Sequence, residues 1–186
     1  LLAQADGSVP VLLRQSGGGA VLTGPWMLGL SVALPPDHPL ACQGLVASYR
    51  WLGEAMAQAL QQGGVDAQAL APEVLRAMPA ERRTAVAWAC FGGLSPWEVL
   101  AGVRKIAGLA QVRRAHGVLL VGGVLLQPSP WQLMCEALGC AAADAQVLAA
   151  TTIGAGEAIA HFDAHACASR LEQVLAATLE PQACPP

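Results

Sequence analysis

The sequence is poor in charge, in aromatic residues and above all in lysine, which occurs once in 186 residues. Only 12% of the residues are charged and 4% are aromatic, whereas 54% are hydrophobic. This balance excludes an intrinsically disordered chain, because disorder requires the opposite composition. Ten basic residues against thirteen acidic ones leave a net charge of -3, without the basic excess that nucleic-acid binding requires. We therefore expect a folded protein with no nucleic-acid partner.

Long apolar runs are also missing from the sequence. The longest one, from Val118 to Leu126, contains Gly122 and Gly123 and is far shorter than the roughly twenty residues that span a bilayer. We therefore expect no membrane partner. The first residues have neither an initiating methionine nor the basic start of a signal peptide, which favours an internal start with residues missing upstream.

The cysteines show no C-x-x-C spacing, which is the usual mark of a metal or redox pair. A chain of this length and apolar content does not need disulfide bonds to fold. The pattern favours reduced thiols and a cytoplasmic protein without a metal site. The six cysteines are Cys42, Cys90, Cys135, Cys140, Cys167 and Cys184.

Hydrophobic periodicity predicts strands in the first two thirds of the chain and helices in the last third. Leu52, Met56 and Leu60 recur every four residues, which predicts one long helix that Gly63 and Gly64 end. We predict strands at residues 9–13, 27–34, 84–91, 97–100, 105–112 and 118–126, and helices at residues 40–62, 72–78, 131–138, 144–150 and 163–179. The last three strands follow one another closely and predict an antiparallel meander.

This order of elements predicts an α+β fold, in which a mixed, mostly antiparallel sheet carries flanking helices. The length fits one domain over residues 1–186, with residues 129–186 as a helical cover.

A glycine-rich segment follows the first predicted strand. Glycines let backbone amides approach an anion closely, and Arg14 would supply a charge beside them. The segment fits neither a Walker loop nor a dinucleotide-binding loop, because the required Gly-Lys-Ser/Thr and Gly-x-Gly-x-x-Gly patterns are absent. A flexible hairpin is the alternative interpretation. The segment contains Arg14, Gln15, Ser16, Gly17, Gly18, Gly19 and Ala20.

Lys105 and Cys90 are two further candidates for chemistry. Lys105 is the single lysine and begins an apolar strand, so it could hold a carboxylate or a developing oxyanion at the rim of a pocket. The alternative is a charge that protects an edge strand from aggregation. Cys90 ends a predicted strand before a glycine-containing loop, which suits a nucleophilic thiol, although an inert core cysteine is the alternative.

A short polar cluster contains His161, Asp163, His165 and Cys167. Two histidines four residues apart can share a helix face as metal ligands. No third ligand or general base accompanies them, so a solvated helix start with Asp163 near its first turn is the favoured interpretation.

Three of these segments together resemble the catalytic domain that lipoate-protein ligases, octanoyltransferases and biotin-protein ligases share. They are residues 13–21 (LRQSGGGAV), residues 90–98 with Cys-Phe and Ser-Pro-Trp-Glu, and residues 104–111 (RKIAGLAQ). The similarity extends from Val9 to about Leu126. It is strongest to the cysteine-dependent octanoyltransferases, which carry a Cys-Phe pair fifteen residues before the active-site lysine, as Cys90 stands fifteen residues before Lys105.

The resemblance implies the family fold, a mixed α/β sheet with flanking helices. It implies that the chain lacks part of the N-terminal segment that family members place before the glycine-rich loop. It also implies octanoyl or lipoyl transfer to the acceptor lysine of an apo lipoyl domain, through a thioester on Cys90 helped by Lys105. The substrate-binding residues would be Arg14, Ser16, Gly17, Gly18, Gly19, Ala20, Gly108 and Ala110.

The resemblance further implies the partners, which are an apo lipoyl-domain protein and either octanoyl-acyl carrier protein or a lipoyl-protein donor. A transferase would need no cofactor, whereas the first alternative, an ATP-dependent lipoate ligase, would use free lipoate, ATP and Mg²⁺. The second alternative is a non-catalytic paralogue that binds lipoate or the acceptor domain. The sequence keeps these alternatives open, because Leu13, Thr23-Gly24 and Gly122-Gly123 stand where many members have arginine, His-Asp and His-Gly.

Overall fold

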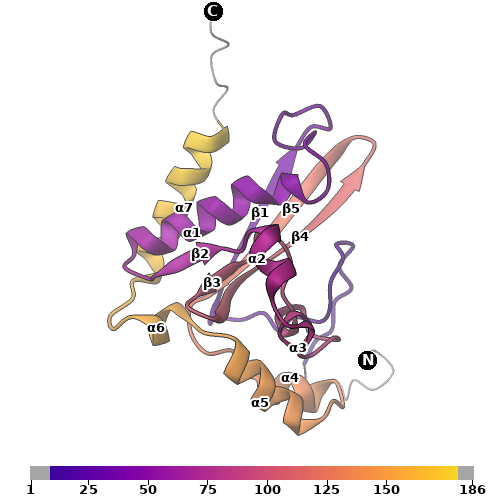
Figure 1. The fold of residues 1–186 in the computed structure, drawn as a ribbon, viewed down its shortest axis with the longest axis vertical. Coiled ribbons are helices and arrows are strands. Elements are labelled where there is room, and N and C mark those ends of the chain that lie inside the picture. Colours follow the sequence, from indigo (N-terminus) through magenta and orange to yellow (C-terminus); the bar gives the residue numbers. More distant parts are fainter. Residues whose placement is uncertain (1–8, 180–186) are drawn as a thin grey trace, which may run out of the picture.

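The computed structural model describes residues 9–179, which form a five-stranded antiparallel sheet with helices on one face and beyond one end (Figure 1). The strands lie in the order β1-β5-β4-β3-β2. Because β3, β4 and β5 are neighbours both in the chain and in the sheet, the predicted antiparallel meander is confirmed. The strands are β1 (Met27–Leu34), β2 (Ala67–Ala69), β3 (Val99–Ala101), β4 (Arg104–Arg114) and β5 (Gly117–Leu125).

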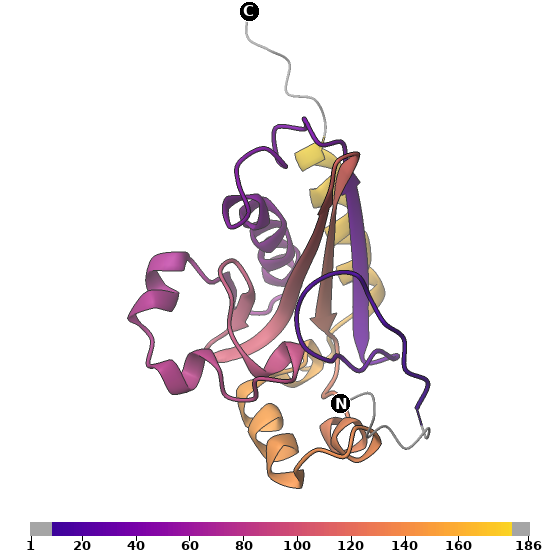
Figure 2. The ribbon, with the colours of Figure 1, turned by 90° about the vertical axis from the view of Figure 1, so that its right-hand side faces the viewer.

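Two long helices cover one face of the sheet, and shorter helices lie elsewhere (Figures 1 and 2). Successive side chains of β1 point to opposite faces of the sheet. Leu28, Leu30 and Val32 therefore pack into the core beneath the long helices, and the residues between them face the other side. No helix among residues 9–179 is long and apolar enough to cross a membrane. The helices are α1 (Arg50–Gln62), α2 (Pro72–Ala77), α3 (Ala80–Arg83), α4 (Trp131–Ala137), α5 (Ala142–Thr151), α6 (Ala155–Ala158) and α7 (Ala164–Leu179), with 3₁₀ turns at Ala47–Tyr49 and Cys90–Gly92.

The main core lies between the sheet and helices α1 and α7. Leu52, Met56 and Leu60 of α1 are fully buried, as their four-residue spacing predicts, and Ile106 and Leu120 meet them from the sheet. A second apolar cluster packs helices α4 and α5 beyond the end of the strands. That cluster includes Phe91, so it supports the turn that carries Cys90.

The helix predicted over residues 40–62 begins later than its apolar pattern suggests. Residues 40–46 form turns, and the α-helix starts at Arg50 after one 3₁₀ turn. Gly44 has a φ of 89°, in the left-handed region that interrupts a right-handed helix. The physical cause of the late start is therefore a glycine conformation that apolar spacing does not reveal.

Two predicted strands are wrong. Residues 9–13 form no ladder, and residues 84–91 form only isolated bridges, Thr84 with Gly93 and Ala89 with Ala20. Both segments have the apolar character of strands, but neither lies beside a partner strand in the described part of the chain. Residues 9–26 instead cross the face of the sheet opposite α1 and α7, in front of the strands in Figure 2.

Candidate active site

A cavity of about 150 Å³ lies between the glycine-rich loop and the face of the sheet opposite α1 and α7. Its walls are mostly apolar and small, and they come from the loop, from β1, β4 and β5, and from the turn after Ala89. Four residues that the sequence analysis selected line it, namely Arg14, Cys90, Gly108 and Ala110. The fold thus brings three segments that are far apart in the sequence to one cavity.

Cys90 lies at the start of the short 3₁₀ turn Cys90–Gly92, and not at the end of a strand. Its backbone N–H donates a hydrogen bond of 2.8 Å to the carbonyl of Ala20, and the N–H of Ala20 donates one of 2.8 Å to Trp88. These bonds connect the turn to the glycine-rich loop. Cys90 is half-buried, has a free thiol and lines the cavity.

Arg14 folds back into its own loop. Its guanidinium donates hydrogen bonds to the Ser16 hydroxyl at 2.6 Å and to the Gly19 carbonyl at 2.8 Å, and it also bonds the Gly17 carbonyl. The loop therefore presents carbonyl groups to an internal cation, which differs from the expected ring of amides around an external anion. Because Gly18 has a φ of 104°, the loop needs glycine at this point.

Arg14 is also the cation that lies near the Cys90 sulfur. A Cβ atom placed on Gly18 would be 2.9 Å from Arg14 Nη2 and 3.7 Å from Cys90 Sγ, so both groups border the same small space. A guanidinium stays protonated at any physiological pH, and it would stabilise negative charge that develops on a sulfur or on an acyl oxygen beside it.

Lys105 is buried, with 1% of its surface exposed, and it lines a separate pocket of about 160 Å³ that does not include Cys90. Strand β4 lies between β3 and β5, so the alternative of an edge-strand charge is wrong. Its ammonium lies 2.7 Å from Glu98 Oε1 and donates hydrogen bonds to the carbonyls of Cys90 at 2.9 Å and Gly93 at 2.8 Å. Lys105 is not one of the described residues that line the cavity beside Cys90 (the thiol cavity).

Glu98 is the buried partner that the sequence analysis did not select. Burial raises the pKa of its carboxyl above the usual 4.5, and the nearby Lys105 ammonium opposes that rise. The sequence does carry a signal for it. A single lysine inside an apolar strand needs a counter-charge if it is buried, and Glu98 is the acid closest to Lys105 in the sequence.

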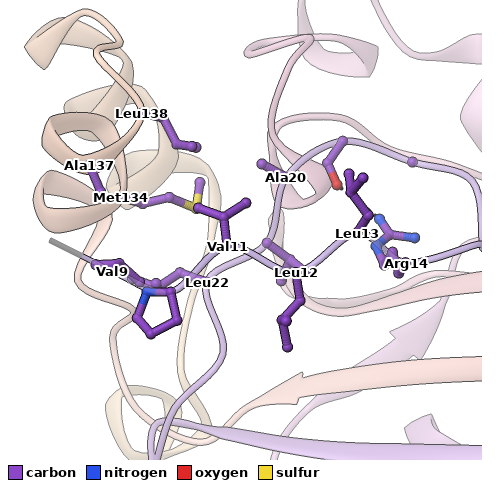
Figure 3. A pocket seen from close by; sticks show the side chains of 14 residues that line it. Val9, Val11, Leu12, Leu13, Arg14, Ala20, Leu22, Met134, Ala137 and Leu138 are labelled. Atoms are coloured by element: carbon purple, nitrogen blue, oxygen red, sulfur yellow. Dashed lines mark hydrogen bonds between the residues drawn. The ribbon is translucent and has the colours of Figure 1, made fainter. Parts of the chain in front are cut away.

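The remaining predicted loop residues divide between two places. Ser16 and Gly17 hold the Arg14 guanidinium, as described above. Gly18, Gly19 and Ala20 line a separate apolar groove of about 270 Å³ that also borders Arg14. Figure 3 shows this groove between the chain leading to Arg14 and the residues Met134 and Ala137 of α4, with Leu138 directly after that helix.

Some of the positions where the sequence departs from the family that it resembles lie at the cavity. Thr23, Gly122 and Gly123 line it, whereas Leu13 lines the separate groove.

The histidine cluster does not form a metal site in the described part of the chain. No group of three or more His, Cys, Asp or Glu residues there could hold a metal ion. The predicted helix start is confirmed, because Asp163 Oδ1 accepts a 2.9 Å hydrogen bond from the N–H of Ala166, and this bond lowers the pKa of the Asp163 carboxyl. The five described cysteines are free thiols, and Cys184 lies outside the described residues.

Comparison with protein families gives a match over most of the chain. A family described as the lipoyl protein ligase A/B catalytic domain matches residues 3–153. Similar curated proteins include the octanoyltransferase LipM of an Exiguobacterium species, 35% identical over 119 residues, and that of Moorella thermoacetica, 32% identical over 126 residues. These alignments cover 64% and 68% of this chain but only 42% and 44% of the relatives, so the chain spans less than half of their length.

Solved structures show the same fold at lower sequence similarity. A bi-partite lipoate protein ligase from Thermoplasma acidophilum superposes with a TM-score of 0.63 at 19% identity, covering 89% of this chain and 56% of that one. A lipoate-protein ligase A bound with ATP gives the same TM-score and identity over 89% of this chain and 57% of that one. The expected mixed α/β fold with an antiparallel sheet is thereby confirmed.

Proposed function

The chain belongs to the lipoyl protein ligase A/B catalytic domain family, and from that membership we propose that it transfers octanoyl or lipoyl groups to the acceptor lysine of apo lipoyl domains in the cytoplasm. The transfer proceeds through a thioester on Cys90. One observation carries this proposal: a half-buried thiol shares a small apolar cavity with a guanidinium group. Apolar walls suit an alkyl chain, and a cation suits the oxygen of its carbonyl.

The proposed reaction has two acyl-transfer steps. The Cys90 sulfur attacks the carbonyl carbon of a thioester donor, the donor C–S bond breaks, and the thiol proton ends on the released donor thiol. The amine of the acceptor lysine then attacks the Cys90 thioester, which forms an amide and returns the proton to the Cys90 sulfur. No oxidant and no nucleotide enters this balance, so the transferase needs no cofactor.

The substrate contacts follow from the cavity walls. Gly108 and Ala110 leave room for the acyl chain along β4, and Arg14 faces the carbonyl end beside Cys90. Ser16 and Gly17 hold Arg14 in place, and Gly18, Gly19 and Ala20 line the neighbouring groove, which Arg14 also borders. Lys105 contacts Cys90 through the main-chain carbonyl, to which its ammonium donates a hydrogen bond.

The proposed partners are an octanoyl-acyl carrier protein or a lipoyl-protein donor and an apo lipoyl-domain acceptor. Two findings support them: the two curated relatives described above are octanoyltransferases, and a structural neighbour is described as a bi-partite lipoate protein ligase and its E2 lipoyl domain.

Intact-mass spectrometry of an apo lipoyl domain tests the proposal. We expect an octanoyl adduct after incubation with this protein and octanoyl-acyl carrier protein, without ATP. Cys90→Ser abolishes the adduct and the acyl-enzyme. Cys140→Ser is the matched control, because Cys140 is also half-buried but does not line the cavity. Transfer by Cys90→Ser at the wild-type rate would show that the thiol mechanism is wrong.

An ATP-dependent lipoate ligase is the second candidate, favoured by the structural similarity to a ligase bound with ATP. Its signature is an adduct that appears only with free lipoate or octanoate, ATP and Mg²⁺, with release of pyrophosphate and no dependence on Cys90. If a folded protein gives no adduct under either condition but binds lipoate or the acceptor domain, the chain is a non-catalytic paralogue.

A further inference from the structure

Glu98 is anchored more firmly than an ordinary acidic residue. Its side chain is 3% exposed, and its Oε2 atom accepts a 2.8 Å hydrogen bond from the N–H of Ser95. Its Oε1 atom accepts a longer bond, 3.4 Å, from the N–H of Leu109 and forms the 2.7 Å ion pair with Lys105. The carboxylate is therefore fixed by the loop before β3 and by β4, and it provides a rigid support for the ammonium group.

The Lys105 ammonium has no hydrogen-bonding capacity left for another group. An ammonium carries three N–H donors, and here they meet Glu98 Oε1 and the carbonyls of Cys90 and Gly93. The Phe91 ring lies 5.1 Å from Nζ and shields it on another side. Lys105 in this arrangement holds the main chain on both sides of the Cys90–Gly92 turn and does not touch the sulfur.

The peptide groups of Cys90 are consequently held at both ends. Its N–H is bonded to Ala20 in the glycine-rich loop, and its C=O is bonded to Lys105 in the sheet. Fixing both groups fixes the direction of the Cα–Cβ bond, and this restricts the sulfur to the few positions that rotation about that bond allows.

We infer that Glu98 is a positioning residue for the Cys90 nucleophile. It holds the Lys105 ammonium against the Cys90 carbonyl, and this contact keeps the sulfur directed into the thiol cavity. This inference rests on the proposed function for its catalytic consequence, although the position of the sulfur can be measured without acyl transfer. Without Glu98 the buried ammonium would lose its only anionic partner among the described residues and would draw water or move toward solvent. The Cys90 carbonyl would then be free.

The decisive variant replaces the whole ion pair with neutral side chains of similar size. Removing one partner alone leaves a buried unpaired charge and endangers folding, whereas replacing both partners avoids that charge. We therefore choose Glu98→Gln with Lys105→Met in one protein. The matched control is Glu157→Gln, which removes the partly exposed ion pair of the adjacent residue Arg104 and leaves the contacts of the Cys90 turn intact.

Two rates are measured on each protein, after a thermal melt shows cooperative unfolding. The first is transfer of octanoyl from octanoyl-acyl carrier protein. The second is alkylation of Cys90 by iodoacetamide, followed by mass spectrometry of the Cys90 peptide, which needs no acyl substrate. For the double variant we expect transfer to fall at least tenfold while alkylation rises at least fivefold, because a sulfur released from the cavity is more exposed and less well aligned. The control changes neither rate.

A folded double variant with both rates within twofold of wild type would overturn the inference, because the pair would then be merely structural. A wild-type protein without transfer, together with a faster alkylation in the double variant, would refute the proposed function and leave the positioning role standing. If the double variant does not unfold cooperatively, Glu98→Asp replaces it. That carboxylate is one methylene shorter, and the same two rates are measured on this variant. Slower transfer with faster alkylation supports the inference, and unchanged rates overturn it.

Discussion

Gly29 offers a direct test of where the acyl chain binds. It lies on β1 opposite Gly123 of β5 and lines the thiol cavity. A Cβ atom placed on Gly29 would meet nothing within 4 Å, so a side chain there grows into open space without a clash. Valine suits a strand position, and Gly29→Val therefore fills part of the cavity while leaving the sheet intact.

The expected loss follows from the length of chain that is displaced. The valine side chain adds three carbon atoms to the cavity wall, which leaves room for about two or three fewer methylene groups. Each buried methylene contributes about 0.8 kcal/mol, so the octanoyl chain loses roughly 1.6–2.4 kcal/mol of binding in the transition state. That energy corresponds to a decrease of about 15- to 60-fold in kcat/KM for an octanoyl donor. A butanoyl donor is short enough to escape most of this loss.

The assay compares octanoyl, hexanoyl and butanoyl donors by intact mass of the lipoyl domain. Ser31→Val is the matched control, since Ser31 is two residues along the same face of β1 but outside the cavity wall. We expect Gly29→Val to shift the preference toward short chains and Ser31→Val to leave it unchanged. If Gly29→Val transfers octanoyl and butanoyl groups in the wild-type ratio, the acyl chain does not occupy this cavity.

Three stability predictions complete the set. Glu98→Gln leaves Lys105 unpaired and costs about 3–5 kcal/mol in urea unfolding, whereas Glu73→Gln, in an ion pair with both side chains over 70% exposed, costs less than about 1 kcal/mol; equal costs would refute the burial argument. Lys105→Met removes the cation that opposes burial, so the pKa of Glu98 rises further above 4.5. A folded-state pKa above the unfolded one favours folding below pH 4.5, and this variant should lose stability more steeply than wild type as pH rises through the folded-state pKa; melts across that range check it. Leu60→Ala, at a fully buried position of α1, costs about 2–5 kcal/mol in the same unfolding assay, and a cost below about 1 kcal/mol would contradict the packing described for α1.

The elements predicted correctly are those whose pattern is local. Strand β1, the meander and the buried stripe of α1 follow from hydrophobic spacing, because a period of two or of about four residues determines which side chains face the core. Residues 9–13 and 84–91 have similar apolar content but make no ladder. Pairing depends on a neighbouring strand, and the composition of a segment does not show whether such a neighbour exists.

The sequence by itself determined which residue types were available for chemistry: one lysine, a cysteine fifteen residues before it, and an arginine beside a run of glycines. It also indicated the family through the spacing of those segments. Only the tertiary structure decided which groups lie near the two cations, Lys105 and Arg14. Chain folding buries Lys105 against Glu98 and the Cys90 carbonyl and brings Arg14 and Cys90 to the same cavity. Electrostatic roles depend on distances across the fold and on burial, and neither quantity is encoded in local sequence spacing.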